Sequence, residues 1–98
     1  MVMTMSEVLS LKVITPEREY IYENCDSVKI PVSDNRKGNG GGSYGIHKGH
    51  ANAIFSISEG KVSAVKNGEA IVEGIISSGF SSVENNIVTV IADGFKVI

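Results

Sequence analysis

The chain has 98 residues and a formal net charge of −2, with 42% hydrophobic and 20% charged residues. This length and balance are typical of one globular domain and exclude a wholly disordered chain. No cluster of Lys and Arg occurs, which excludes the usual electrostatic binding of nucleic acid. No apolar run approaches the roughly 20 residues that a membrane-spanning helix needs, so we expect no direct membrane insertion.

Alternating apolar and polar residues, the pattern of half-buried strands, recur along the chain, and no helical period occurs. In chain order, the predicted strands cover residues 8–15, 18–23, 28–32, 51–58, 61–66, 69–76, 80–84 and 87–92. Pro31 lies in the third strand and requires a sheet edge or a position that faces no partner carbonyl, because it has no N–H. Asn67 and Gly68 predict a type I′ hairpin turn, since both residues accept positive φ. Gly79 predicts a bulge with positive φ.

Short strands at this spacing predict an all-β fold, an antiparallel β-sandwich or flattened barrel of about seven to ten strands. Residues 1–98 are predicted to form this single domain, with a flexible Gly-rich loop at 34–43. We expect residues 93–98 to follow the last strand. Because the chain lacks tryptophan and has only 6% aromatic residues, the core must consist mainly of aliphatic side chains.

Residues 38–52 form the one unusual passage, since they contain six of the eleven glycines and both histidines. A phosphate-binding loop would need a following Lys-Ser/Thr pair and a helix, and this passage has neither. A metal site is a second hypothesis, but His47 and His50 would point to opposite faces of a strand. Zinc needs three or four ligands, and no spacing brings in Cys25 or Asp34. We therefore expect no cofactor and no metal, and favour a loop that contacts another protein.

No catalytic set is evident in the sequence. The serines between 77 and 82 lie near Glu73 and Glu84, but no histidine is close to them. Cys25 cannot form an internal disulfide, which suits a reducing compartment, and we expect it to be a small, half-buried filler in a turn. The residues alone therefore predict a binding or structural module.

Three separated passages, 11–17, 45–51 and 78–93, resemble the amino-terminal β-sandwich domain of the epsilon subunit of F-type ATP synthases. The first, Leu-Lys-Val-Ile-Thr-Pro-Glu, is similar to the first strand and Thr-Pro-Glu turn of that family. The second, Gly-Ile-His-Lys-Gly-His-Ala, resembles its Gly-hydrophobic-x-Pro-Gly-His-Ala loop, with Lys48 at the usual proline and Asn52 at a second one. The third contains Ser-Gly-Phe and Val-Thr-Val-Ile-Ala-Asp, which resemble its closing passage.

The resemblance implies a non-catalytic subunit of the central stalk that binds the gamma subunit and the c-ring and couples proton-driven rotation to ATP synthesis. It implies a peripheral place in the synthase at the cytoplasmic face of the bacterial inner membrane. It places a turn that faces the c-ring at Ser43, Tyr44 and Gly45. It places the residues near gamma at His50, Asn52, Ile54 and Phe55.

Two further expectations concern the end of the chain and the glycines. The family's carboxy-terminal helical hairpin, associated with inhibition of ATP hydrolysis and in some members with ATP binding, has no counterpart in this chain, so we expect neither property. The alternative hypothesis is a free-standing β-sandwich module that binds a small ligand or an anion through residues 38–45.

Overall fold

The computed structural model describes residues 8–32 and 42–98, which form ten strands and no helix. The strands are β1 (Leu9–Ile14), β2 (Glu19–Cys25), β3 (Ser27–Val32), β4 (Gly42–His47), β5 (Ala53–Ile57), β6 (Gly60–Lys66), β7 (Glu69–Ile76), β8 (Gly79–Glu84), β9 (Ile87–Ala92) and β10 (Phe95–Val97). Eight of them match the predicted strands to within a few residues. β4 and β10 were not predicted.

Only two residues of the loop predicted at 34–43 can be compared with the structure. Residues 34–41 lie outside the described residues, whereas Gly42 and Ser43 begin strand β4 and are not part of a loop. β4 pairs with β3 along its whole length, from Gly42 opposite Val32 to His47 opposite Ser27.

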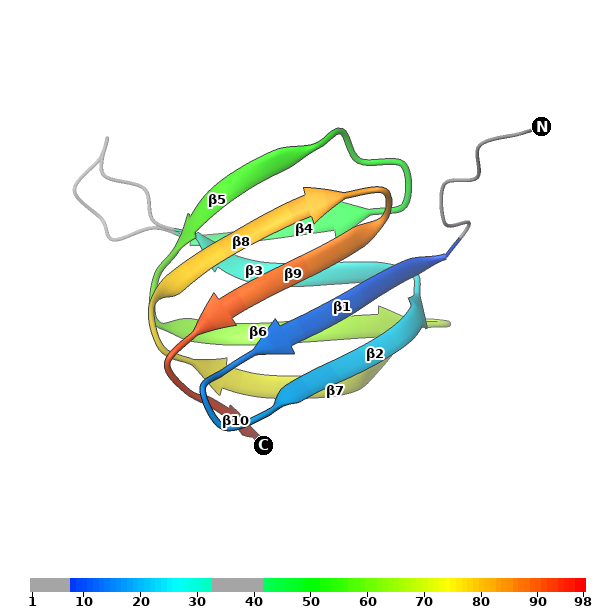
Figure 1. Cartoon of the computed structure of the whole chain (residues 1–98). Helices are drawn as coiled ribbons and strands as arrows, with labels where there is room; N and C mark the ends of the chain where they lie inside the picture. The colour runs from blue at the N-terminus through cyan, green and yellow to red at the C-terminus, as the bar shows by residue number, and fades with distance from the viewer. Residues whose placement is uncertain (1–7, 33–41) are drawn as a thin grey trace.

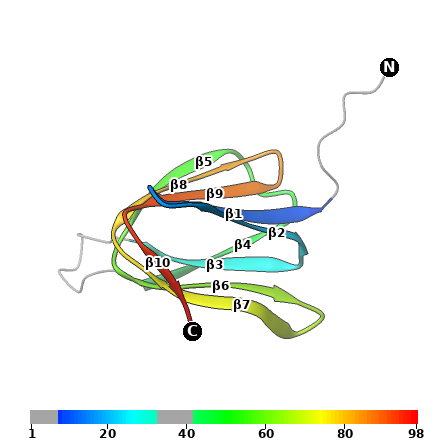
Figure 2. The ribbon, with the colours of Figure 1, turned by 60° about the horizontal axis from the view of Figure 1, so that its bottom comes forward.

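The strands form one strongly curled sheet whose two halves face each other across the core. The order is β10-β7-β6-β3-β5-β8-β9-β1-β2, with β4 joined to β3 outside this path. β1, β2, β5, β8 and β9 form one layer, and β3, β4, β6, β7 and β10 form the other (Figure 1, Figure 2). The predicted sandwich or flattened barrel is confirmed. One pair of strands is parallel, β1 with β9, and Leu11 lies opposite Val88 in that pair.

The core consists of aliphatic side chains that alternate along the strands with exposed or half-buried ones. Those with no exposed surface are Leu9, Leu11, Val13, Val28, Ile30, Ile46, Val62, Ala64, Ile76, Val88 and Val90. Full burial of each Val, Leu or Ile contributes about 1.5–3 kcal/mol, so these rows supply most of the driving force for folding. The period-two alternation of the sequence predicted the rows because successive strand residues point to opposite faces.

Pro31 meets the condition that the sequence imposed on it. Its carbonyl oxygen accepts a hydrogen bond of 3.0 Å from the backbone N–H of Ser58. Because N and O of a strand residue point to the same side, its nitrogen also faces that side. There β6 pairs only with residues 27–29 and β5 pairs only with Val32, so the missing donor falls in the gap between them. The ring itself is buried against Gly60.

The turns also follow their residues. Asn67 and Gly68 have φ values of 55° and 81°, which confirms the predicted hairpin between β6 and β7. Asn85 and Asn86 have φ values of 53° and 65° and form the turn between β8 and β9.

Gly79 is required for a different reason from the one predicted. Its φ is not positive. A Cβ atom at this position would instead overlap the backbone carbonyl of Ile91 on the neighbouring strand β9. Only glycine allows the two backbones to approach so closely, and there is no flexible side chain that could move aside.

Replacement of Gly79 with alanine should therefore destabilise the domain by about 1–3 kcal/mol, because the new methyl group forces β8 and β9 apart. Urea-induced unfolding measures the loss. Gly94→Ala is the matched control, since a Cβ atom there would have nothing within 4 Å. Equal stability of the two variants would contradict the close approach.

Candidate functional site

β4 and β5 lie at an open seam of the sandwich. β4 pairs with β3, and no ladder among the described residues joins it to β5. Three rings bridge this seam, those of Tyr44 on β4, His50 in the connection and Phe55 on β5, which we call the seam cluster. The Tyr44 and Phe55 centroids are 4.8 Å apart, and the His50 centroid lies 5.7 Å and 6.3 Å from them. Side chains therefore close an edge that backbone hydrogen bonds leave open.

Both nitrogens of the His50 ring have protein partners. Nδ1 lies 2.6 Å from the carbonyl oxygen of Ala51, which can only accept, so Nδ1 carries a hydrogen. Nε2 lies 2.8 Å from the Tyr44 hydroxyl, and in the neutral ring it accepts the bond that Tyr44 donates. A metal ion at His50 would have to displace one of these partners. Across the described residues, no three His, Cys, Asp or Glu side chains are grouped so that they could hold a metal ion.

The connection from β4 to β5 begins with a tight turn over residues 47–50. The N–H of His50 donates a 3.2 Å hydrogen bond to the carbonyl of His47. Gly49 has a φ of 87°, and Lys48 has no positive φ. This combination is typical of a type II turn, which favours proline at its second position and glycine at its third. Lys48 occupies the position that favours proline.

Ser43, Tyr44 and Gly45 lie within strand β4, so their prediction on a turn is wrong. The run of glycines concealed the strand because glycine is a poor strand former. Ser43 and Gly45 are exposed on the outer face of the sheet, whereas Tyr44 points to the seam, where it contacts His50 and Phe55. Tyr44, which was predicted to face the c-ring, thus meets His50 and Phe55, which were predicted to lie near gamma.

The residues predicted near gamma are divided between two faces. His50 and Phe55 belong to the seam cluster, while Asn52 and Ile54 lie on the outside. Ile54 is 80% exposed, and with Asn52 it lines a shallow hollow beside β8, whose other wall includes Ser82. This hollow has a volume of about 340 Å³. The passage 50–55 therefore offers both a fixed aromatic cluster and an exposed apolar side chain.

The alternative hypothesis, a module that binds a small ligand or an anion through residues 38–45, is only partly open to comparison. The first four of these residues lie outside the described residues, and the last four are in strand β4. Strand β5, not a helix, is the next element. The converging N–H groups of a helix N-terminus, which bind phosphate in such loops, are thus missing from the described part of this passage.

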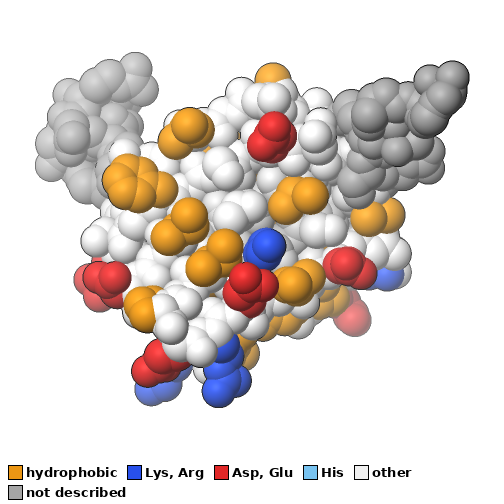
Figure 3. All heavy atoms as spheres, in the orientation of Figure 1, with side chains coloured by type: hydrophobic (Ala, Val, Ile, Leu, Met, Phe, Trp, Pro, Cys, Tyr) orange, Lys and Arg blue, Asp and Glu red, His pale blue; other side chains and the backbone are white. Residues whose placement is uncertain are grey.

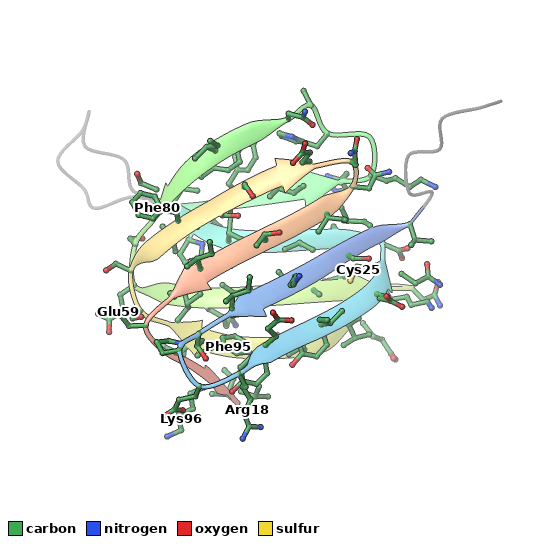
Figure 4. The ribbon with its side chains drawn as sticks, in the orientation of Figure 1. Arg18, Cys25, Glu59, Phe80, Phe95 and Lys96 are labelled. Atoms are coloured by element: carbon green, nitrogen blue, oxygen red, sulfur yellow. The ribbon has the colours of Figure 1, made fainter. Side chains whose placement is uncertain are left out.

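Two of the residues considered for catalysis, Cys25 and Ser77, have structural roles. Cys25, predicted to be half-buried, is only 5% exposed and lies between the two layers (Figure 4). Burial raises the pKa of its thiol, whose Sγ lies 3.5 Å from the carbonyl oxygen of Tyr22. A protonated, buried thiol is a poor nucleophile. Ser77 uses its hydroxyl to accept a 3.1 Å hydrogen bond from the N–H of Gly94.

One exposed surface was not predicted as a site. A groove of about 630 Å³ lies where β1, β5 and β9 end and β8 begins, and it is lined by Ile14, Phe80 and Ile91 among others. Phe80 and Ile91 are directly opposite each other and are 62% and 53% exposed. Figure 3 shows this face with separate apolar side chains among charged ones. The sequence signal that could have indicated this groove is the pair Phe80 and Ile91, two apolar residues at outward positions of their strands.

Removal of the Tyr44 hydroxyl should weaken the seam. Tyr44→Phe keeps the contact with Phe55 but deletes the bond to His50, and we expect a loss of about 0.5–1 kcal/mol because the bond is partly exposed. Thermal unfolding measures it. Tyr22→Phe is the control, since among the described residues the Tyr22 hydroxyl makes no hydrogen bond. An equal change in both variants would show that the Tyr44 bond adds nothing.

Proline at position 48 should stabilise the domain. It fixes the φ that the type II turn requires, and the preceding residue His47 already has the extended conformation that proline demands. We expect Lys48→Pro to add about 0.4–1 kcal/mol by restricting the unfolded chain. Lys48→Ala, which removes the same charge without fixing φ, is the control in thermal unfolding. A lower midpoint for Lys48→Pro than for Lys48→Ala would reject the turn assignment.

Comparisons with known proteins agree with the fold and with the passages described above. Residues 8–97 match the family described as ATP synthase, Delta/Epsilon chain, beta-sandwich domain. Proteins named ATP synthase epsilon chain from Granulibacter bethesdensis and Magnetococcus marinus are 27% and 30% identical to this chain. These matches cover 86% and 91% of this chain but 57% and 59% of the relatives, so the chain spans little more than half of their length.

Solved structures show the same fold at low sequence identity. A chain of the Euglena gracilis mitochondrial ATP synthase (OSCP/F1/c-ring) has a TM-score of 0.75 at 15% identity, over 96% of this chain and 56% of that one. A chain of the Tetrahymena thermophila mitochondrial ATP synthase (central stalk/c-ring) has a TM-score of 0.69 at 13% identity, over 94% and 68%. None of the described residues forms a helix long and apolar enough to cross a membrane. Because the family match covers nearly the whole sequence, the chain belongs to the β-sandwich domain family of ATP synthase delta and epsilon chains.

Proposed function

We propose that this domain is a non-catalytic subunit of the central stalk of an F-type ATP synthase. It binds the gamma subunit and the c-ring and couples proton-driven rotation to ATP synthesis. The observation that carries this proposal is the family match over residues 8–97. Solved structures support it because the same fold occurs in one assembly described as OSCP/F1/c-ring and in another described as central stalk/c-ring.

The proposed role requires a domain that transmits force without deforming. The core described above is continuous between the two layers, and close packing of aliphatic side chains resists compression. We propose that its partners hold it at the cytoplasmic face of the bacterial inner membrane.

The surface proposed for the partners is the passage 43–55. Ser43 and Gly45 on the outer face of β4 face the c-ring, and Asn52 and Ile54 face gamma. The exposure of Ile54 supports this assignment, because an apolar side chain that is 80% exposed is available for burial against a partner. The seam cluster lies between the two groups and keeps their relative positions fixed.

A charge at position 54 should weaken binding of gamma. Because Ile54 is so exposed, Ile54→Asp should leave the fold intact, whereas a carboxylate buried in an interface without a partner costs affinity. We expect at least about tenfold weaker binding to purified gamma by isothermal calorimetry. Ile21→Asp is the matched control, since Ile21 is 55% exposed on β2 of the same layer.

Ser43→Glu extends the same experiment to the ring, and it should weaken binding to the detergent-solubilised c-ring more than binding to gamma. Two results would reject the proposal. The first is a folded wild-type domain that binds neither partner. The second is equal weakening by Ile54→Asp and Ile21→Asp.

A further inference from the structure

Asn86 is an unusual residue for its position. It is the second residue of the two-residue turn between β8 and β9, where glycine is generally favoured because φ is positive. An asparagine side chain at such a turn normally points into solvent, but Asn86 is only 4% exposed. Its neighbour Asn85 has a similar φ of 53° and is exposed. The two residues thus share a backbone conformation but differ in what their side chains contact.

The Asn86 side chain reaches across the domain to the turn at 47–50. Its Oδ1 accepts a 2.7 Å hydrogen bond from the N–H of Gly49, which is 37 positions away in the sequence. Its backbone carbonyl accepts a 2.9 Å bond from the N–H of Ser10, just inside β1. Asn86 therefore connects three segments, namely the β4–β5 turn, the β8–β9 hairpin and the first strand.

The turn at 47–50 depends on the contact with Asn86, because no strand pairing connects this turn to the layer that contains β8 and β9. The hydrogen bond from His50 to His47 fixes the internal shape of the turn, but it does not fix where the turn lies. No ladder among the described residues joins β4 to β5, so two contacts hold the turn in place across the seam. One is the seam cluster and the other is the bond from Gly49 to Asn86.

We propose that Asn86 is a positioning residue for partner binding. It holds the turn at 47–50, with exposed Lys48 at its apex, in the place where the turn meets a protein partner. Asn86 is itself too buried to touch that partner. A turn that is already ordered loses less conformational freedom on binding, which improves affinity without adding a contact. This inference rests on the proposed function, in which the passage 43–55 forms the contact with the stalk.

Three variants distinguish the effect of the Asn86 side chain from the effect of the turn conformation. Asn86→Gly removes the acceptor Oδ1 and tolerates the positive φ. Asn86→Asp retains an acceptor oxygen, so it should restore the bond to Gly49. Asn85→Gly makes the same chemical change at the exposed neighbour. If Asn86→Gly fails to fold, Asn86→Ser takes its place, because its hydroxyl is too short to reach Gly49.

Two measurements are made on each variant. Amide hydrogen exchange by NMR follows the N–H of Gly49 relative to the core amides of Val88 and Val90, which separates local loosening from global unfolding. Calorimetry gives the affinity for purified gamma. For Asn86→Gly we expect exchange at Gly49 to be about fivefold faster and the affinity about fivefold lower, the effect of one lost hydrogen bond. Asn86→Asp should keep Gly49 protected relative to the core amides, although its buried carboxylate lowers the global stability. Asn85→Gly should behave like the wild type.

The possible failures are distinguishable. If Gly49 stays protected in Asn86→Gly, or loses protection while the affinity is unchanged, the positioning role is wrong and the proposed function stands. If Gly49 loses as much protection relative to the core amides in Asn86→Asp as in Asn86→Gly, the acceptor oxygen is not the cause, which also overturns the inference. If the folded wild-type domain does not bind gamma, the proposed function fails and this inference fails with it.

Discussion

Aromatic side chains close the sandwich at the two places where no ladder joins its layers within the described residues. At one seam the rings of the seam cluster lie between β4 and β5. At the other, Tyr20 on β2 meets Phe95 on β10 edge to face at 4.9 Å, and the Arg18 guanidinium lies 5.8 Å from the Tyr20 ring (Figure 4). A sheet that closed fully would have no free edges. This one keeps its shape through ring packing against the aliphatic core.

The proposed contact surface follows from the first of these seams. Since β4 and β5 are not paired, the passage between them is free to leave the sheet, and polar contacts then determine its position. The ring of His50 is held by Tyr44 and Ala51, and Gly49 is held by Asn86. The same passage therefore combines exposure with order, which a binding surface requires. The apolar groove at Phe80 lies elsewhere on the layer that contains β5 and β8, on its outer face.

Sequence patterns within a few residues predicted the inward rows of the strands and the tight turns. The alternation of Leu9, Leu11 and Val13 gave an inward row, and Asn67 with Gly68 gave a type I′ turn. Contacts between distant segments could not be found in this way. The parallel pairing of β1 with β9 has no turn signal, and the need for glycine at Gly79 comes from a backbone on another strand.

The candidate site shows the same division. Tyr44 and Ile46 alternate as a strand requires, but the glycines beside them outweighed that signal, so β4 was predicted as a loop. The exposure of Ile54 follows from the period of its strand, because successive residues point to opposite faces. The role of Asn86 depends on a contact across 37 positions, which no local pattern reveals.

The assignment to the stalk is tested most directly by hydrogen–deuterium exchange of the domain, alone and with purified gamma and c-ring. If the passage 43–55 is the contact surface, added partners should slow exchange in peptides that span β4, the turn and β5, and leave the outer strand β2 unchanged. Protection confined to the groove around Phe80 and Ile91, or no protection of a folded domain, would contradict it.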